Sequence, residues 1–360
     1  MFSIRDKLLN AVKNDKNYLK KIGAKDKELI KNELNLIKSI KKKDLKKFST
    51  QELLALYKEL EQSYEVSLGV SHVVEGFSLT CEDTIRNKIQ QVAHKQKRDF
   101  KEIFATLTAP LTPSFLGIVH NKLVTIAAKL RKKENIDKEL EELETNYFWI
   151  KNSYSGAKRL DKKWFRHEAE QEAKNGHEAN DLQATFQKAK QKKEGLIKEL
   201  KLDSELIQLL TINDFIAEMH DRRKEYITLT ITYLDACMEE IGKRYNITIE
   251  NMRFLAPPEI YDEKIMKSMT NAKPEQRRKS SIYFDAKAVF PSFEVYTGKE
   301  AEKLIEEIEQ QSGAGNAKEI KGNPASHGKA VGKVKICKDN HDIDSVKEGD
   351  ILVACMTQPE

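Results

Sequence analysis

The placement of proline restricts the fold of this chain more than any other feature. None of its eight prolines lies in residues 1–109 or in the stretch between Pro113 and Pro257. Because proline breaks helix interiors, both stretches can form long helices. Residues 298–360 differ, since they hold seven of the 15 glycines. The sequence therefore predicts a mainly α fold, in which a large multi-helix domain precedes a small β hairpin and helix and then the first strands of a β/α domain.

Two segments of the first part show the periodicity of amphipathic helices. Ser49 and Glu52 have the spacing of a capping box, and apolar side chains follow at helical intervals, at Leu53, Tyr57, Leu60 and Tyr64. A second apolar stripe runs from Ile136 to Ile150. Both segments are predicted to be helices.

The segment YITLTITYL, residues 226–234, fits two kinds of structure. Its alternating apolar residues and its threonines favour a strand. The same region also carries a helical apolar pattern from Ile227 to Ile241, and no glycine or proline interrupts residues 196–241. An uninterrupted stretch of this length favours a helix.

Beyond residue 280 the pattern changes to short strands. Strand candidates are residues 281–284 and 288–296, where Pro291 favours an edge position. A capping box at Thr297 and Glu300 predicts a helix, and strands are predicted again at residues 330–338 and 350–356. We therefore divide the chain into a helical domain (1–280), a strand–strand–helix connector (281–318) and a third segment (319–360).

Positive charge is concentrated at the amino-terminal end. The net charge is +6 overall, yet the first 50 residues hold 15 Lys or Arg against six Asp or Glu. The run KKKDLKK at residues 41–47 has no interleaved aromatic side chains to stack on bases, and it holds lysine where base-reading arginine is expected. A solvated helix face is the favoured interpretation, so nucleic acid is not an expected partner.

The cysteines and the first residues indicate the compartment. The four cysteines, at positions 81, 237, 337 and 355, form neither a CxxC site nor a dense disulfide framework. Residues 1–20 carry charges every few positions and match neither a signal peptide nor a membrane span. We expect a cytoplasmic protein with no membrane association.

The stretch KGNPASHGKAVGKVKI, residues 321–336, is rich in glycine but fails two tests for nucleotide binding. A P-loop, GxxxxGK[ST], has a hydroxyl after its lysine, whereas Ala330 stands here, and Gly322 and Gly328 are one residue too far apart. A dinucleotide fingerprint leads into a helix, whereas the alternating residues after Gly328 predict a strand. The stretch is therefore interpreted as a turn that enters a strand.

The same stretch, its spacing to GDILVACMTQP and the preceding FEVYTGKEAEKLIEE resemble the beginning of the phosphohistidine swivelling domain of phosphoenolpyruvate-utilising enzymes. This family includes phosphoenolpyruvate synthase, pyruvate phosphate dikinase and rifampicin phosphotransferase. The resemblance covers residues 293–359, and the helical segment NYFWIKNSYSGAKRLDKKWF also looks like the region before this domain in synthase-like members. The matching motif positions, expected to be structural, are Gly322, Pro324, Ala325, Ser326, Gly328, Gly332, Gly349, Asp350, Met356, Thr357 and Pro359.

The resemblance implies phosphoryl transfer through a phosphohistidine. In the family this histidine lies in a GGxTxHA-type motif downstream of the MTxP segment, so we expect it beyond Glu360 and assign no catalytic residue to this chain. His327 stands where the family usually has proline and is expected to have no catalytic role. ATP or phosphoenolpyruvate, with Mg²⁺, is implied for the full system. The nucleotide site is expected on a nucleotide-grasp domain or a separate chain, and this chain is expected to bind no cofactor.

Two further groups of residues have a possible functional interpretation. The aromatic residues Tyr147, Trp149, Tyr154 and Trp164 fit either a helix-packing core or a pocket for a small-molecule acceptor. His167 and His177 are each followed by glutamate, but their separation does not place them on one helical face as in HExxH, so a solvated helix is favoured over a metal site. For the whole chain, the alternative is a non-catalytic helical binding module whose basic amino-terminal segment binds nucleic acid or an acidic partner.

Overall fold

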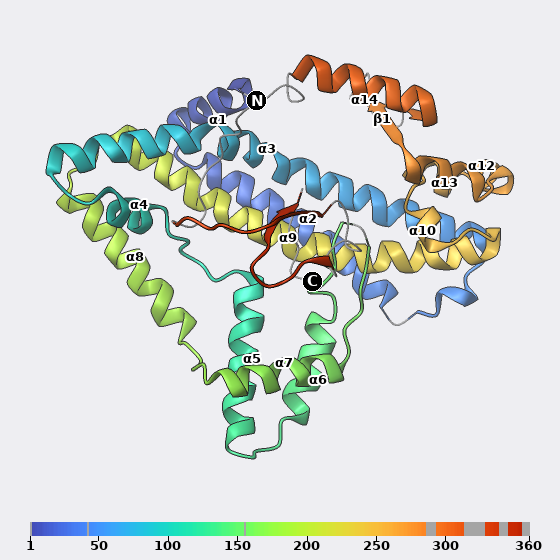
Figure 1. The fold of residues 1–360 in the computed structure, drawn as a ribbon, viewed down its shortest axis with the longest axis horizontal. Coiled ribbons are helices and arrows are strands. Elements are labelled where there is room, and N and C mark those ends of the chain that lie inside the picture. Colours follow the sequence, from blue (N-terminus) through green and yellow to red (C-terminus); the bar gives the residue numbers. More distant parts are fainter. Residues whose placement is uncertain are drawn as a thin grey trace. The chain divides into compact units, whose positions relative to one another are not determined.

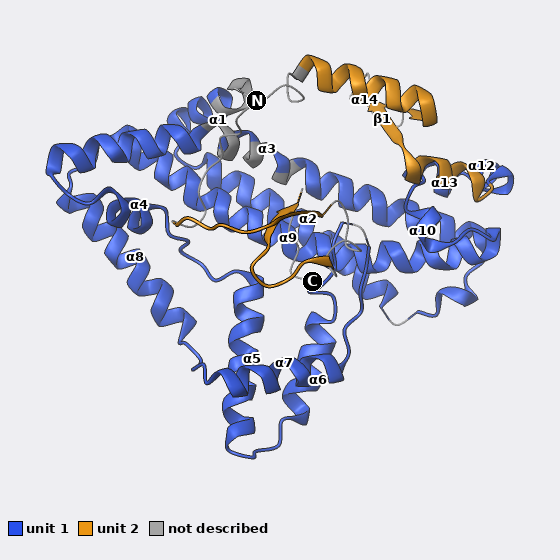
Figure 2. Ribbon diagram, viewed as in Figure 1, with its two compact units in different colours: residues 1–269 blue, residues 270–360 orange. Residues whose placement is uncertain are grey.

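The computed structural model describes residues 2–41, 43–154, 156–285, 293–312, 328–337 and 345–354. It confirms a mainly α fold with a small amount of β structure in the carboxy-terminal part (Figure 1). The chain divides into two compact units, residues 1–269 and residues 270–360 (Figure 2). Within the described ranges, no helix combines the length and the apolar character needed to cross a membrane.

Unit 1, residues 1–269, is built from helices. Its three longest are α2 (Tyr18–Ile40), α3 (Thr50–Gln96) and α9 (Ser204–Tyr245). The shorter elements, in chain order, are α1 (Phe2–Asn14), the 3-10 turn η1 (Leu45–Lys47), α4 (Phe100–Thr108), α5 (Phe115–Arg131), α6 (Asp137–Tyr147), α7 (Lys162–Asn175), α8 (Leu182–Glu199), α10 (Ile249–Met252), α11 (Pro257–Tyr261) and α12 (Glu263–Ser268).

The packing of α2 and α3 against α9 forms the frame of unit 1 (Figure 1). Helices α3 and α9 run antiparallel: Leu53, near the start of α3, shares a core cluster with Ile241, near the end of α9. At the opposite end, Ile89 of α3 packs in a second cluster with Leu206 of α9. Long apolar stripes of opposite direction thus bury each other along most of both helices.

The predicted start of α3 is confirmed. The Ser49 side chain accepts a hydrogen bond from the backbone N–H of Glu52 (3.2 Å), and the Glu52 carboxylate accepts one from the backbone N–H of Ser49 (2.7 Å). This reciprocal capping box satisfies two backbone donors that a helix leaves unpaired at its amino-terminal end. The local sequence therefore determines where the longest helix begins.

The ambiguous segment at residues 226–234 is helical and lies inside α9, as its length predicts. The threonines that favour a strand find partners within the helical packing. Thr228 donates its hydroxyl to the carbonyl of Lys224 in the preceding turn (2.7 Å), and Thr230 donates its hydroxyl to the carboxylate of Glu33 on α2. Tertiary packing therefore overrides the local preference for a strand.

Helices α5, α6 and α7 share a core of their own, to which Leu140 of α6 and Phe165 of α7 contribute. The loop between α6 and α7 ties this layer to α9. There the Asn152 amide donates to the carbonyl of Thr228 (2.6 Å) and to the hydroxyl of Thr232 (2.7 Å). These hydrogen bonds satisfy a buried polar side chain at the junction.

Unit 2 contains the predicted hairpin and helix. Strands β1 (Ser281–Asp285) and β2 (Phe293–Thr297) pair antiparallel, and α14 (Gly298–Ser312) follows directly. Pro291 lies outside the described residues. Two further strands, β3 (Val334–Cys337) and β4 (Ile351–Ala354), form a separate two-stranded sheet.

The division between the units falls before α13 (Ala272–Lys279), whereas the sequence boundary near residue 280 falls at its end. Helix α13 packs against the hairpin and α14. Its Arg277 is buried, with the guanidinium 5.8 Å from the centre of the Tyr283 ring. These contacts group α13 with unit 2.

Substitutions at two helical glycines, one tightly packed and one open to solvent, test the packing of unit 1. A Cβ added at Gly242 of α9 would lie 2.5 Å from the carbonyl oxygen of Ile247, whereas one added at the exposed Gly195 of α8 would meet nothing within 4 Å. We expect Gly242→Ala to lower the free energy of unfolding by about 1–3 kcal/mol. The matched change Gly195→Ala should raise it by up to about 1 kcal/mol, because alanine favours helix. Urea titration followed by circular dichroism measures both, and shifts in the same direction would contradict this packing.

Candidate functional sites

The strands predicted within the swivelling-domain resemblance pair with each other. In the parallel ladder of β3 and β4, Val334 pairs with Ile351 and Cys337 pairs with Ala354. The backbone N–H of Ile351 donates to the carbonyl of Lys333 just before β3 (2.9 Å). A parallel pair requires a crossover connection, and residues 338–344 of that connection lie outside the described part.

Two glycines of the predicted motif meet where this ladder begins. A Cβ on Gly332 would lie 2.2 Å from the carbonyl oxygen of Gly349, so only glycine fits there without a backbone shift. Gly349 itself has a φ of 88°, which side chains rarely allow. The adjoining turn is closed twice, since the N–H of Lys347 donates to the Asp350 carboxylate and the N–H of Asp350 donates to the Lys347 carbonyl, each at 3.0 Å. These contacts close the turn before β4 and hold it against the residue two positions before β3. The motif residues therefore have a structural role here.

Among the described motif positions, Gly328 shows no such close contact. A Cβ on Gly328 would meet nothing within 4 Å, although its φ of 156° also suits glycine. The remaining motif positions and His327 lie outside the described residues, namely Gly322, Pro324, Ala325, Ser326, Met356, Thr357 and Pro359.

The four aromatic residues of the candidate acceptor pocket are not equivalent. Trp149 is buried, and its indole N–H donates to the carbonyl of Asn146 (2.9 Å). Tyr147 and Trp164 are half-buried against the core of α5, α6 and α7, whereas Tyr154 is 64% exposed. Three of the four therefore hold these helices together, and Tyr154 lies apart from them.

A buried polar cluster lies midway along α2, α3 and α9, where no sequence motif pointed. Glu33 of α2 is completely buried, and its carboxylate accepts the hydroxyl of Thr230 from α9. Burial raises the pKa of Glu33, while the hydroxyls of Thr230 and Ser67 partly oppose this rise. The interior of the bundle thus favours the neutral form of a carboxyl group.

Glu61 and Glu65, one turn apart on α3, form an acidic pair near Glu33. Burial and then the charge of Glu65 raise the pKa of Glu61 to about 8, and the two side chains are hydrogen-bonded. Burial also raises the pKa of Glu65. Burial is likewise the main cause that raises the pKa of the intervening Tyr64 to about 12, with smaller effects of Tyr154 and Glu33. Because two close carboxylates in a poorly solvated site cannot both ionise easily, this pair shares a proton at neutral pH.

The polar cluster can therefore hold a proton inside the helical unit near neutral pH. A carboxyl group that stays protonated at that pH can donate a hydrogen bond, which is also the property of a general acid. The sequence does contain a signal for this polar cluster. Glu33 continues the apolar stripe between Ile30 and Ile37, and Glu61 lies one turn after the buried Tyr57. A charged residue at a core position of an amphipathic helix marks such a site.

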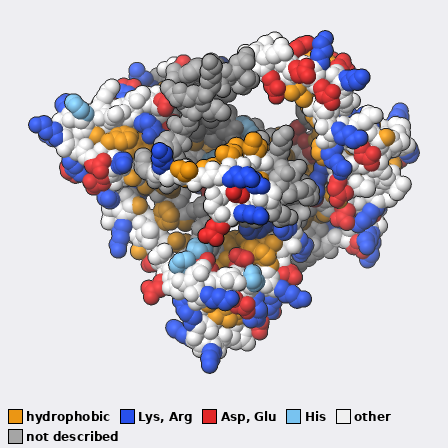
Figure 3. All heavy atoms as spheres, viewed as in Figure 1, with side chains coloured by type: hydrophobic (Ala, Val, Ile, Leu, Met, Phe, Trp, Pro, Cys, Tyr) orange, Lys and Arg blue, Asp and Glu red, His pale blue; other side chains and the backbone are white. Residues whose placement is uncertain are grey.

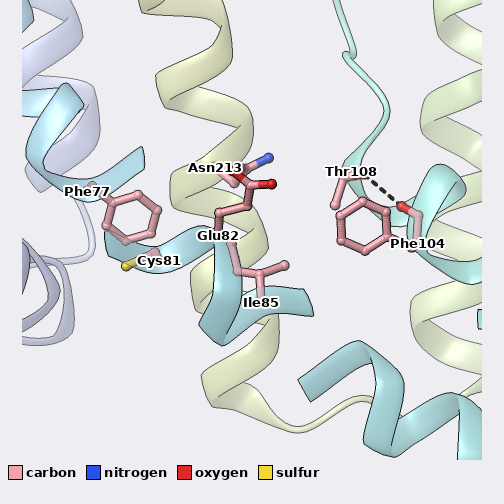
Figure 4. Close-up of a pocket in the computed structure, with 7 residues that line it drawn as sticks. All are labelled: Phe77, Cys81, Glu82, Ile85, Phe104, Thr108 and Asn213. Atoms are coloured by element: carbon pink, nitrogen blue, oxygen red, sulfur yellow. Dashed lines mark hydrogen bonds between the residues drawn. The ribbon is translucent and has the colours of Figure 1, made fainter. Parts of the chain in front are cut away.

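A cavity of about 250 Å³ lies between α3, α4 and α9, away from the predicted aromatic residues; it is lined by Phe77, Cys81, Glu82, Ile85, Phe104, Thr108 and Asn213 (Figure 4). Its walls are mixed, since Glu82, Thr108 and Asn213 line it beside four apolar residues. Glu82 pairs with Arg86 at 3.2 Å, and Thr108 donates its hydroxyl to the carbonyl of Phe104 (2.7 Å). At this size, below the roughly 300–1,000 Å³ of most ligand sites, it has room only for a small molecule.

The basic run at residues 41–47 is partly used in packing. Lys41 donates to the carbonyl of Thr145 (3.4 Å), and the Lys43 ammonium lies 5.7 Å from the centre of the Phe48 ring. On the face drawn in Figure 3, lysine and arginine side chains are interspersed with acidic ones across the described surface. The described residues of the run do not form the predicted helix face: they follow the end of α2 at Ile40 and include the 3-10 turn η1.

Comparison of the chain with protein-family models, curated proteins and solved structures found no match in any of the three. What the chain does is therefore inferred from its own residues and their arrangement.

The shared proton of Glu61 predicts a specific dependence of stability on pH. An unfolded glutamate releases its proton by about pH 5. The folded chain holds the proton of Glu61 to a pKa of about 8. The folded state therefore binds more protons between these values, and the free energy of unfolding falls as pH rises through this range. We expect Glu61→Gln, which is neutral at every pH, to raise the free energy of unfolding by about 1–3 kcal/mol at pH 8–9.

Urea denaturation of wild type and variant at pH 5, 7 and 9 measures this effect, and the difference should shrink towards pH 5. The matched control is Glu59→Gln, an exposed position on the same helix, which should change the pH profile little. Parallel pH profiles for wild type and Glu61→Gln would show that Glu61 ionises normally in the folded chain.

The contact between Gly332 and Gly349 predicts that the ladder tolerates no side chain at position 332. We expect Gly332→Ala to separate β3 from β4 and to speed hydrogen exchange at the Ile351 amide, which donates across the ladder. Exchange in α9 should not change, since α9 belongs to unit 1. Val331→Ala is the control, because Val331 is 88% exposed. Equal exchange at Ile351 in both variants would rule out the close contact.

Proposed function

We propose that this chain is a component of a synthase-like phosphotransferase of the phosphoenolpyruvate-utilising type. The observation that carries the proposal is the parallel pairing of β3 and β4 with Gly332 against Gly349. These strands and glycines lie in the segment that resembles the beginning of a phosphohistidine swivelling domain.

The surface of this strand pair adds support. Apolar side chains on both strands are well exposed among the described residues, with Val334 55%, Ile336 66% and Val353 47% accessible. Parallel sheets occur almost only with both faces covered by further structure. A β/α domain that continues around this pair would provide that cover.

The proposed chemistry divides one phosphoryl transfer into two. A ring nitrogen of the carrier histidine attacks the phosphorus of ATP or phosphoenolpyruvate, the bond from phosphorus to the leaving oxygen breaks, and the electron pair stays on that oxygen. In the second step an acceptor oxygen takes the phosphoryl group and the imidazole leaves. We place this histidine beyond Glu360, in the GGxTxHA-type motif of the family, and assign the nucleotide site to another domain or chain.

Unit 1 is proposed as the docking or acceptor-binding part. Its long helices pack along most of their length, and the cavity at Phe77 and Phe104 offers room for a small group. This role is proposed by analogy with the helical region that precedes the swivelling domain in synthase-like members. The acceptor itself is left open.

The reading frame downstream of Glu360 provides the first test. We expect it to encode a GGxTxHA-like histidine within about 40 residues, which together with residues 319–360 gives a segment in the size range of a small domain. Its absence would remove the basis of the proposal.

Phosphorylation provides the second test. A longer chain that includes this histidine, incubated with radiolabelled ATP or phosphoenolpyruvate and Mg²⁺, should gain a phosphate that is lost in acid and retained in base. A nucleotide-grasp partner is included in one arm, and the matched controls are the chain ending at Glu360 and a longer chain with the histidine changed to alanine. Failure of both donors to label the longer chain, or equal labelling of the alanine variant, would contradict the function.

A further inference from the structure

His120 of α5 meets Glu172 and His177, which lie five residues apart at the end of α7, on one face of unit 1. The Nδ1 atom of His177 lies 2.7 Å from one carboxylate oxygen of Glu172, and the Nδ1 atom of His120 lies 3.7 Å from the other. One ligand atom from each residue lies within 4.8 Å of the other two. The two imidazole rings meet edge to face, with their centres 6.4 Å apart.

The geometry points to a binding site for a divalent transition metal of the zinc class, held by His120, Glu172 and His177. This inference does not rest on the proposed phosphoryl transfer. Bonds of about 2.0–2.1 Å to a tetrahedral zinc ion place ligand atoms about 3.3 Å apart. The distances of 2.7 Å and 3.7 Å from the two histidines, each to a different oxygen of Glu172, lie on either side of this value, and one ligand atom from each residue is within 4.8 Å of the others. Both histidines are 58% exposed, so rotation of their side chains can close the remaining distance.

The backbone that carries these ligands is held in place. His120 lies on α5, Glu172 lies in the last turn of α7, and His177 follows directly after Gly176, the left-handed cap of α7 (φ 74°). The guanidinium of Arg131 on α5 donates to the carbonyl of His177 (3.1 Å). The loop with His177 is thus fastened to the helix that carries His120.

A second clamp acts three residues further along the loop. The Asn121 side chain donates to the carbonyl of Asn180 (2.9 Å) and accepts from the N–H of Asn180 (2.8 Å). Asn121 is the neighbour of His120, so this reciprocal pair holds the loop next to one ligand. Because the backbone is already held, only the side chains lose conformational freedom when a metal binds.

The ligand set selects the class of metal. Imidazole nitrogen together with one carboxylate oxygen suits Zn²⁺ and its neighbours Ni²⁺ and Cu²⁺, whereas Mg²⁺ and Ca²⁺ prefer oxygen ligands only. Three protein ligands leave a fourth position open to water. The carboxy-terminal end of α7, with its partial negative charge, also favours a cation at this place.

The spacing of histidines in the sequence does not reveal this site. His167 and His177 are the histidines that lie near each other in the sequence, and they do not converge: the His167 ring faces Gln171 on its own helix (3.5 Å). The partner of His177 is instead His120, on a different helix. Packing of α5 on α7 creates the pair.

Titration calorimetry of the metal-free 360-residue chain with Zn²⁺ tests the site. We expect one saturable Zn²⁺ site that His120→Ala and His177→Ala each weaken by at least about tenfold, the loss that even changes outside the ligand set can cause. Glu172→Gln should act in the same direction. His167→Ala, an exposed histidine on α7, is the matched control and should bind like the wild type. Circular dichroism confirms that each variant is folded.

Two further measurements separate this site from other metal ligands. Zn²⁺ should raise the melting temperature of the wild type and of His167→Ala, but not of the other two histidine variants, because the metal joins α5 to α7. Co²⁺ bound in place of Zn²⁺ should show no thiolate charge-transfer band, which would reveal cysteine ligation. Mg²⁺ and Ca²⁺ should not compete.

The proposal is wrong if the wild type binds no Zn²⁺, or if either His120→Ala or His177→Ala binds it as tightly as the wild type. An equal loss in His167→Ala, or a thiolate band with Co²⁺, would also overturn it. In those cases Glu172 serves only as the hydrogen-bond partner of His177.

Discussion

The antiparallel packing of α3 on α9 is the interaction on which unit 1 depends. Both helices are long, at 47 and 42 residues, and isolated helices in water gain little stability without a buried face. Their contact supplies that face, with one core cluster at each end. The shorter helices attach to these ends: α1, α4 and α8 at one, and α10, α11 and α12 at the other. A change that shifts α3 along α9 would therefore disturb the shorter helices at both ends.

Polar contacts between the two ends set the register of this packing. The buried Asp26 of α2 accepts from the guanidinium of Arg222 on α9 at 2.8 and 2.9 Å, and Glu33 accepts from Thr230 two turns further on. A buried charged group without its partner is costly, so a register slip of α2 would be penalised. The carboxyl group of Glu61 lies in the same region, where burial and then the neighbouring Glu65 raise its pKa.

The two units suggest a division of labour. Unit 1 is held by extensive helix packing and carries the cavity, the shared proton and the proposed metal site. In unit 2, the short ladder of β3 and β4 is closed by backbone contacts at Gly332 and Gly349, with apolar side chains exposed on both strands. The inferred zinc site lies entirely within unit 1, so metal binding would stabilise that unit and leave the ladder of β3 and β4 unchanged.

The sequence by itself determined where most elements lie. Proline-free stretches, the capping box at Ser49 and the glycine-rich residues 298–360 are local signals, and local backbone preferences follow them directly. Only the tertiary structure decided which side chains meet: Glu33 with Thr230, Gly332 with Gly349, and His120 with His177. The physical reason is that helical periodicity tells which face is buried but not which helix covers it. That choice depends on the packing of complementary surfaces from distant parts of the chain.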